Sequence, residues 1–299
     1  MNADFDALRP ERPLKFLTYG CASLGGNPDN FQDEVRVARS AMEHGLWFHA
    51  SQEYNCAFWI LRRAFDEDPA NKPPLFIKVR CDHAATIEFD VEDALCRLNV
   101  ECVEIAQLCR SRHDRRRIVA DFLNHGEMWQ VCERLKSQGK VGRFVLEVFS
   151  LFSADALQGV ENGLFPGYIT YLNLGQREMN NPLFEVIHQK RAPIFSLRSV
   201  YGGNFDPEKI KVLRARDPKH DVIQKYDVLE PIFRESGCAD WVEFSFSFLK
   251  SCPNVLSTIS GTSKFQRLQE LVKAEASARP LPSALSLRIQ NLHRQWLKQ

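Results

Sequence analysis

The sequence of 299 residues lacks the features that direct a protein to a membrane or to nucleic acid. It contains no uninterrupted apolar run of spanning length, and its first residues, MNADFDALRPERPLKF, include no apolar core of a signal peptide. The 39 basic and 38 acidic residues leave a formal charge of +1, so no overall field attracts nucleic acid or anionic lipid. We therefore expect a soluble, cytoplasmic protein with neither a nucleic-acid nor a membrane partner.

The nine cysteines also lack a pattern. None of them forms a C-x-x-C pair, and an odd number in a chain of this length is typical of reduced thiols rather than of a disulfide framework. Zinc could be bound by a mixture such as His49, Cys81, His83 and Cys109, which follow neighbouring predicted strands, but the sequence has no compact ligand spacing. We therefore predict no metal site.

The sequence does contain a regular alternation of short apolar runs and amphipathic stretches. The runs predict strands at 14–20, 46–50, 74–80, 102–109, 143–149, 168–174, 192–200 and 254–261. Between these runs the apolar residues recur at helical spacing, as they do from residue 31 to residue 43. Asp90 is expected to cap the helix that follows the third strand.

Eight strands that alternate with helices predict a parallel sheet. Eight such units in about 250 residues have the size of a closed (β/α)8 barrel, or TIM barrel. We predict one barrel domain over residues 1–299 with a C-terminal helical tail, because no change in composition divides the chain. The alternative is an open doubly wound sheet, although the loop after the first strand, YGCASLGG, lacks the G-x-G-x-x-G pattern of such sheets.

Polar residues stand at the ends of several predicted strands, where the active sites of such barrels lie. The stretch GLWFHASQEY turns from apolar to polar at His49 and reaches Tyr54, while Lys78 and Cys109 stand at the ends of the third and fourth strands. We expect His49, Tyr54, Lys78 and Cys109 to converge at the mouth formed by the carboxyl ends of the strands.

These segments, in this order, resemble the aldo-keto reductase superfamily over nearly the whole chain. The resemblance rests on ARSAMEHGLWFHASQEY, PLFIKVR, LCRLNVECVEIAQLC, ERLKSQGKVGRFVLEVFSLFSADAL and NVLSTISGTSKFQRLQELVKA. It implies the reduction or oxidation of a small carbonyl metabolite with NADPH through a tetrad of Asp, Tyr, Lys and His. In that tetrad Tyr donates the proton, and Lys lowers the pKa of the Tyr hydroxyl.

Two members of the implied tetrad have a different residue type here. The resemblance places the tyrosine at Tyr54 and the lysine at Lys78, but His49 stands in place of the aspartate and Cys109 in place of the histidine. The family's aspartate keeps the lysine charged, and neutral His49 offers hydrogen bonding without that charge. Cys109 is too short and too weak a donor to orient a carbonyl as imidazole does, although its thiolate could partner Lys78.

The resemblance also implies positions for NADPH. They are Ser150 and Tyr171 at the carboxamide, and Ser260, Gly261, Ser263, Lys264 and Arg267 at the adenosine and its 2′-phosphate. Lys264 and Arg267 stand near the place of the family's phosphate-binding arginine, at the start of a helix whose N–H groups favour an anion.

Three functions stay open on the sequence. The first is the NADPH-linked reductase. The second is the same barrel used for cofactor-independent chemistry, as in an isomerase, dehydratase or lyase, with Tyr54, Lys78 and His49 transferring protons. The third is a non-catalytic binding subunit. Tyr54 and Lys78 argue against the third function, and the changed cofactor positions argue against the first.

Overall fold

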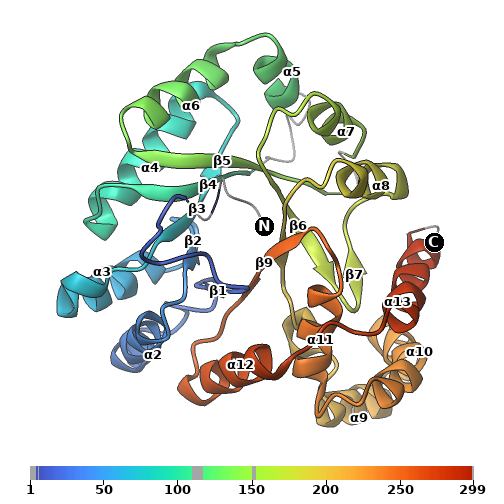
Figure 1. The fold of residues 1–299 in the computed structure, drawn as a ribbon. Coiled ribbons are helices and arrows are strands. Elements are labelled where there is room, and N and C mark those ends of the chain that lie inside the picture. The colour runs from blue at the N-terminus through green and yellow to red at the C-terminus, as the bar shows by residue number, and fades with distance from the viewer. Residues whose placement is uncertain (1–4, 6, 110–116, 150–152, 298–299) are drawn as a thin grey trace.

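Each predicted apolar run coincides at least in part with a parallel strand in the computed structural model, which describes residues 5, 7–109, 117–149 and 153–297 (Figure 1). The strands are β1 (Leu17–Gly20), β2 (Phe48–Ala50), β3 (Leu75–Arg80), β4 (Val103–Cys109), β5 (Val141–Glu147), β6 (Tyr168–Asn173), β8 (Ile194–Leu197) and β9 (Val255–Ser260). They pair in the order β5-β4-β3-β2-β1-β9-β8-β6, and the pairing of β5 with β6 closes the sheet. The prediction of a (β/α)8 barrel is confirmed.

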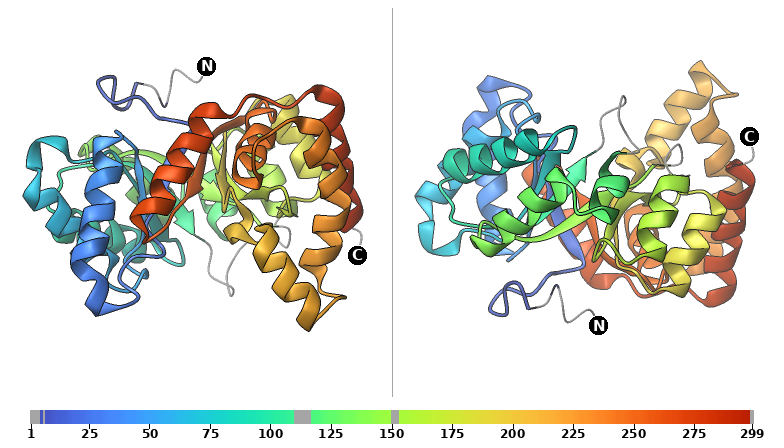
Figure 2. Two further views of the ribbon diagram at one scale, coloured as in Figure 1. Left: turned by 90° about the horizontal axis from the view of Figure 1, so that it is seen from below. Right: turned by 90° about the horizontal axis from the view of Figure 1, so that it is seen from above.

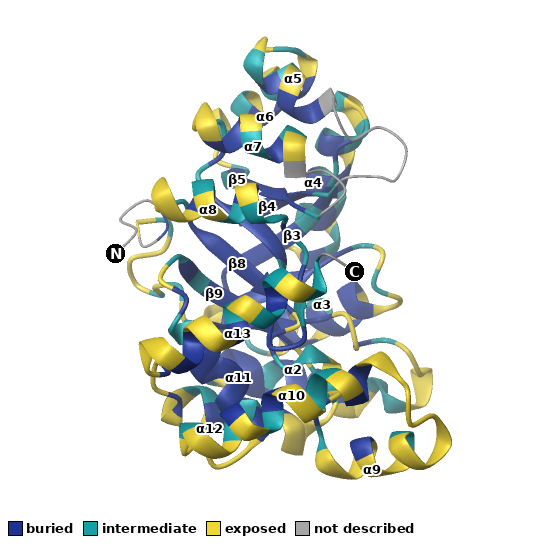
Figure 3. Cartoon of the chain, turned by 90° about the vertical axis from the view of Figure 1, so that its right-hand side faces the viewer, coloured by how far each residue is buried: buried dark blue, intermediate teal, exposed yellow. Residues whose placement is uncertain are grey.

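Helices surround the barrel and expose their outer faces, while the strands inside are buried (Figure 3). They are α2 (Phe31–Glu43), α3 (Ala57–Glu67), α4 (Ala84–Leu98), α5 (Arg117–Leu123), α6 (Glu127–Ser137), α7 (Ser153–Glu161), α8 (Asn181–Gln189), α9 (Pro207–Arg216), α10 (Asp221–Ser236), α11 (Trp241–Lys250), α12 (Phe265–Ser277) and α13 (Ser283–Trp296). Short 3-10 helices occur at Pro28–Asn30, Pro69–Asn71 and Tyr201–Gly203. Within the described ranges, no helix has the length and apolar character needed to cross a bilayer.

Two local features differ from the sequence expectations. A short strand, β7 (Gln176–Arg177), adds an antiparallel hairpin to β6. Helix α4 begins at Ala84, so the prediction that Asp90 caps it is wrong. Asp90 lies inside the helix, is fully buried and accepts hydrogen bonds from the backbone N and the guanidinium Nη2 of Arg80, at 2.8 and 2.6 Å. Because a buried carboxylate requires such partners, this pair ties α4 to the end of β3.

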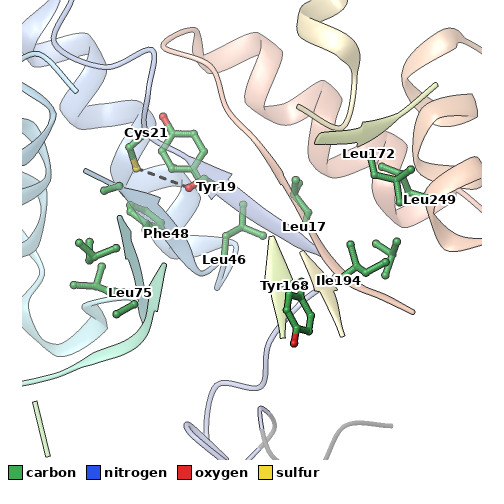
Figure 4. Packing of buried hydrophobic residues seen from close by; sticks show 14 of the residues in the cluster. Leu17, Tyr19, Cys21, Leu46, Phe48, Leu75, Tyr168, Leu172, Ile194 and Leu249 are labelled. Carbon is green, nitrogen blue, oxygen red and sulfur yellow. Dashed lines mark hydrogen bonds between the residues drawn. The ribbon is translucent and has the colours of Figure 1, made fainter. Parts of the chain in front are cut away.

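Alternate side chains of each strand pack outward against the helices. The rings of Tyr19 on β1 and Phe48 on β2 meet at 5.1 Å, next to Cys21, and Leu172 of β6 lies against Leu249 of α11 (Figure 4). The hydroxyl of Tyr19 also donates a hydrogen bond to the carbonyl of Thr262 at 2.7 Å. This layer therefore fixes both the helices and the start of the loop after β9.

The other alternate side chains point into the barrel and fill its amino end with large rings. Phe195 meets Phe76 at 5.1 Å and Phe5 at 5.2 Å between ring centroids. The indole N–H of Trp47 donates to the carbonyl of Arg12 at 3.0 Å. The N-terminal segment thus closes the amino end of the barrel. Figure 2 shows this segment on one side of the barrel and α9 on the opposite side.

Candidate active site

Polar side chains replace the rings at the carboxyl end of the same strands. Trp47, Phe76, Ile105 and Val145 belong to the interior cluster of the amino end. Because side chains two residues apart in a strand share a face, the next inward side chains are His49, Lys78, Gln107 and Glu147. These four come from β2, β3, β4 and β5, which are consecutive neighbours in the sheet.

A buried chain of hydrogen bonds joins three of these groups. His49 Nε2 lies 2.7 Å from Gln107 Oε1, and Gln107 Nε2 donates to Glu147 Oε1 at 2.9 Å. The exposed fractions of His49, Gln107 and Glu147 are 1%, 0% and 4%. Burial, and then the charge of Lys78, lower the pKa of His49 to about 3, so its imidazole is neutral at neutral pH.

Tyr54 and Lys78 meet beside this chain. Tyr54 lies in the turn between β2 and α3, where its carbonyl accepts a hydrogen bond from the backbone N of Ala57 at 2.8 Å. Lys78 Nζ lies 5.5 Å from the centroid of the Tyr54 ring and can hydrogen-bond its hydroxyl. The rings of His49 and Tyr54 lie 6.3 Å apart. Three of the predicted site residues are therefore brought together.

The pKa values of the pair follow from burial and charge. Burial raises the pKa of the Tyr54 hydroxyl to about 12, although Lys78 opposes the shift. Burial alone would lower the pKa of Lys78, but the pKa is raised because Cys109, Tyr54 and Glu147 together favour the ammonium. At neutral pH Tyr54 therefore keeps its proton and Lys78 keeps its charge.

Cys109 ends β4 and adjoins the same group. Burial, followed by the negative charge of Glu147, raises the pKa of the Cys109 thiol well above its ordinary value. A hydrogen bond to Glu147 also favours the neutral thiol. The thiolate that the sequence suggested as a partner of Lys78 is therefore not populated at neutral pH.

The sequence analysis did not identify Gln107 and Glu147. Both are polar residues inside apolar runs, CVEIAQLC and RFVLEVF, and each stands two positions after an apolar residue that faces the barrel interior. This spacing of two residues could have identified Gln107 and Glu147 as site residues. A polar residue on the inner face, near the carboxyl end of a barrel strand, faces the mouth where active sites lie.

One of the positions implied for the cofactor carboxamide lies on β6, the strand that pairs with β5. Tyr171 on β6 is half-buried, and its ring stacks on Phe149 with centroids 5.6 Å apart. The guanidinium of Arg198 lies 5.2 Å from the centroid of the Tyr171 ring. Ser150 lies outside the described residues.

The positions implied for the adenosine follow β9. Ser260 is buried at the end of this strand. Gly261 approaches β1 so closely that a Cβ atom would lie 1.6 Å from the carbonyl oxygen of Gly20. Glycine is therefore required at residue 261, and the loop that follows is held against β1.

A cleft of about 500 Å³ opens beside that loop, between the first turns of α2 and α12. It is lined by Asn30, Asp33, Arg36, Val37, Ser263, Lys264 and Phe265. The structure thus brings Ser263 and Lys264 into one cleft, together with Arg36, which the sequence analysis did not identify. Arg267 instead pairs with Glu270 at 2.8 Å and with Asp206 at 3.8 Å.

The donor set of this cleft fits the phosphorylated end of a nucleotide. Arg36 and Lys264 supply cations, and the ring of Phe265 is 54% exposed. The carboxylate of Asp33 lies 3.4 Å from Arg36 and offsets part of that charge. Among the described residues, no group of three or more His, Cys, Asp or Glu side chains is arranged to hold a metal ion.

Residues 16–290 match the model of the Aldo/keto reductase family. The chain belongs to the aldo/keto reductase family. Family membership supports a general oxidoreductase role. No curated protein sequence matches the chain.

Solved aldo-keto reductases share the fold at low sequence identity. One from Klebsiella pneumoniae in complex with NADPH is 16% identical, with a TM-score of 0.70 over 94% of this chain and 92% of that chain. Another from the same organism, in complex with NADP and acetate, is 17% identical, with a TM-score of 0.68 over 94% and 92%. One from Bacillus halodurans, in its apo form, is 18% identical, with a TM-score of 0.71 over 94% and 95%.

Proposed function

We propose that this protein reduces a small carbonyl compound with NADPH, with Tyr54 as the proton donor and Lys78 as its charged partner. The observation that carries the proposal is the contact between Tyr54 and Lys78 at the mouth of a barrel that belongs to the aldo/keto reductase family.

The pair is suited to proton donation toward a carbonyl oxygen. Tyr54 is protonated at neutral pH because burial raises its pKa to about 12. When its proton passes to the carbonyl oxygen, a phenolate remains, and the ammonium of Lys78 stabilises that phenolate by charge and by hydrogen bonding. When bound, NADPH supplies the hydride.

Lys264 and Arg36 are the residues that we assign to the phosphorylated adenosine end of NADPH. They line one cleft with Phe265, whose exposed ring offers a flat surface for a base. We assign Ser260, Gly261 and Ser263 to the same end of the cofactor, and Tyr171 to its nicotinamide end, with Phe149 beneath the Tyr171 ring.

Cofactor-independent proton transfer is the second candidate. The buried chain of His49, Gln107 and Glu147 favours this second candidate. The chain places an imidazole at the end of β2, where the family's tetrad has an aspartate, and a carboxylate at the end of β5, where the tetrad has no member. In that case the protein would exchange a substrate proton with solvent without consuming NADPH.

The proposal is tested by NADPH binding and NADPH oxidation in the same samples. Binding is followed by tryptophan fluorescence, and oxidation by absorbance with a panel of small aldehydes and ketones. We expect the wild type to bind and oxidise NADPH. We expect Tyr54→Phe to bind equally well but to react about a hundredfold more slowly, since one placed general acid contributes about this factor.

Tyr226→Phe is the matched control, because Tyr226 lies on α10, outside the barrel, and its ring centroid lies 4.8 Å from that of Trp241. It should leave both binding and turnover unchanged. A wild type that does not bind NADPH contradicts the proposal, and proton exchange in heavy water without NADPH would then support the second candidate. Absence of both activities would support a binding subunit.

A further inference from the structure

Lys78 has one carboxylate among the groups that stabilise its charge, and that carboxylate is Glu147. Glu147 is the last residue of β5 and is 4% exposed. It stands two strands away from Lys78, and Gln107 on the intervening strand is the registered neighbour of Lys78. Gln107 pairs with Val145 on its other side and reaches Glu147, two residues further along β5, through the hydrogen bond of its amide nitrogen at 2.9 Å.

The other groups that favour the ammonium of Lys78 carry no negative charge at neutral pH. Cys109 and Tyr54 also favour the ammonium when they are ionised. However, burial raises the pKa of both groups, to about 12 for Tyr54, so both are neutral at neutral pH. His49, on which the charge of Lys78 also acts, is neutral as well. Among the side-chain types of Cys109, Tyr54, His49 and Glu147, only the carboxylic acid of glutamate is an anion in water at neutral pH.

Glu147 also determines how the neighbouring side chains are oriented. A carboxylate accepts hydrogen bonds but cannot donate them, so the amide nitrogen of Gln107 must face it. The amide oxygen of Gln107 then faces His49 Nε2 at 2.7 Å, and this nitrogen must carry the hydrogen. The lone pair of neutral His49 is consequently on Nδ1.

We propose that Glu147 is a positioning residue that takes over the role of the missing aspartate: its charge keeps Lys78 protonated, and through Gln107 it holds His49 as the neutral Nε2–H tautomer. The carboxylate has moved from the end of β2 to the end of β5, and a histidine fills the vacated position. Only the consequence for catalysis rests on the proposed function, because the charge and the tautomer exist without substrate.

The first test measures the ionisation of Lys78. Trace labelling with acetic anhydride at a series of pH values, followed by mass spectrometry of the Lys78 peptide, reports the fraction of free amine. Glu147→Gln removes the charge and keeps the shape, whereas Glu147→Asp keeps the charge. Glu104→Gln is the matched control, because Glu104 is also buried, at 2% exposure, but binds Arg9 Nε at 2.6 Å and the backbone N of Leu75 at 2.5 Å near the start of β4.

We expect Glu147→Gln to lower the pKa of Lys78 by about one unit or more, which is the usual effect of losing a nearby opposite charge. Labelling of Lys78 at about pH 9 should then rise about tenfold, since one pKa unit changes the free-amine fraction by that factor. Glu147→Asp and Glu104→Gln should label like the wild type. An unchanged Lys78 titration in Glu147→Gln, or an equal change in Glu104→Gln, would overturn the proposal.

The second test uses nitrogen NMR of the histidine rings and needs no variant of Glu147. In the wild type at neutral pH, the His49 ring, assigned by its loss in His49→Gln, should be the neutral Nε2–H tautomer. A His49 that is cationic or carries its proton on Nδ1 would also overturn the proposal, even if Glu147→Gln failed to fold. Both tests are made without NADPH and without substrate, so a protein that never oxidises NADPH would refute the proposed function and leave these results unaffected.

Discussion

The two ends of the barrel interior are built on the same four strands and differ in what they bury. At the amino end, Trp47 and Phe76 lie among other apolar side chains. Two residues later, the same strands present His49 and Lys78 at the mouth. Burying a ring stabilises the fold, whereas burying an ionisable group costs free energy unless partners satisfy it. The amino end therefore serves stability, and the mouth holds groups whose ionisation is set by their neighbours.

The two buried carboxylates illustrate the same contrast. Glu104, near the start of β4, is held by the guanidinium of Arg9 and the backbone of Leu75. Glu147, at the end of β5, is held by the Gln107 amide, and its charge favours the ammonium of Lys78. The first carboxylate fixes the N-terminal segment to the barrel, while the second acts on groups that reach the mouth.

The largest expected effect is a loss of stability when a ring is removed from the amino end of the barrel. Phe76→Ala should lower the free energy of unfolding by about 3–5 kcal/mol, because it removes a fully buried ring that meets Phe195 and His49. Urea denaturation measures the change. Phe89→Ala is the control, because Phe89 is 62% exposed on α4 and its loss should cost at most about 0.5 kcal/mol. Equal losses of stability in the two variants would contradict the claim that the buried rings of the amino end stabilise the fold.

The next effect concerns pH and stability. Burial lowers the pKa of both His49 and His293 to about 3, from an ordinary value of 6.5. Between these values the unfolded chain binds protons that the folded chain does not, so stability is full above pH 6.5 and falls as the pH decreases toward 3. Each histidine contributes up to about 1.4 kcal/mol per pH unit. His293→Gln should remove its share, as measured by urea denaturation at about pH 6 and pH 5; an unchanged slope would argue against a neutral buried His293.

A smaller effect concerns catalysis in Glu147→Gln. Because Lys78 would lose its proton at a lower pH, the alkaline limb of kcat/KM should move down by about one unit. The rate should begin to fall about one pH unit lower in the variant than in the wild type, and the two rates should agree near neutral pH, whereas the KM for NADPH should not change. Steady-state rates across pH measure both quantities. A uniform loss at every pH would indicate a structural defect rather than a change in the ionisation of Lys78.

The smallest effect concerns the cleft between α2 and α12. Replacing both Lys264 and Arg36 with alanine should weaken NADPH binding about tenfold and leave NADH binding nearly unchanged, because exposed cations contribute modestly to phosphate binding. Fluorescence titrations with both cofactors measure the difference. Replacing Arg267 alone should have less effect, because this side chain is already paired with Glu270. Equal losses for NADPH and NADH would exclude the phosphate role.

The sequence was sufficient for the fold and for part of the site. The eight apolar runs at regular intervals predicted the strands, and the end of a barrel strand predicted the places of Lys78 and Tyr54. The sequence analysis missed Glu147 because RFVLEVF reads as one apolar run. Its spacing of two residues from Val145 became informative once the closed sheet showed that Val145 faces the interior. The sequence analysis missed Arg36 for a different reason. Arg36 and Lys264 line one cleft because β1 and β9 are neighbours, which places the starts of α2 and α12 side by side.

Hydride transfer from NADPH through the Tyr54 and Lys78 site is the central claim, and isotope transfer tests it most directly. The protein is incubated with NADPH that carries deuterium at both C4 positions, together with the aldehyde panel, and the alcohol products are analysed by mass spectrometry. We predict an alcohol with one deuterium on the former carbonyl carbon from the wild type, and about a hundredfold less of it from Tyr54→Phe. An alcohol without deuterium, or no alcohol from any aldehyde at saturating NADPH, would contradict the claim.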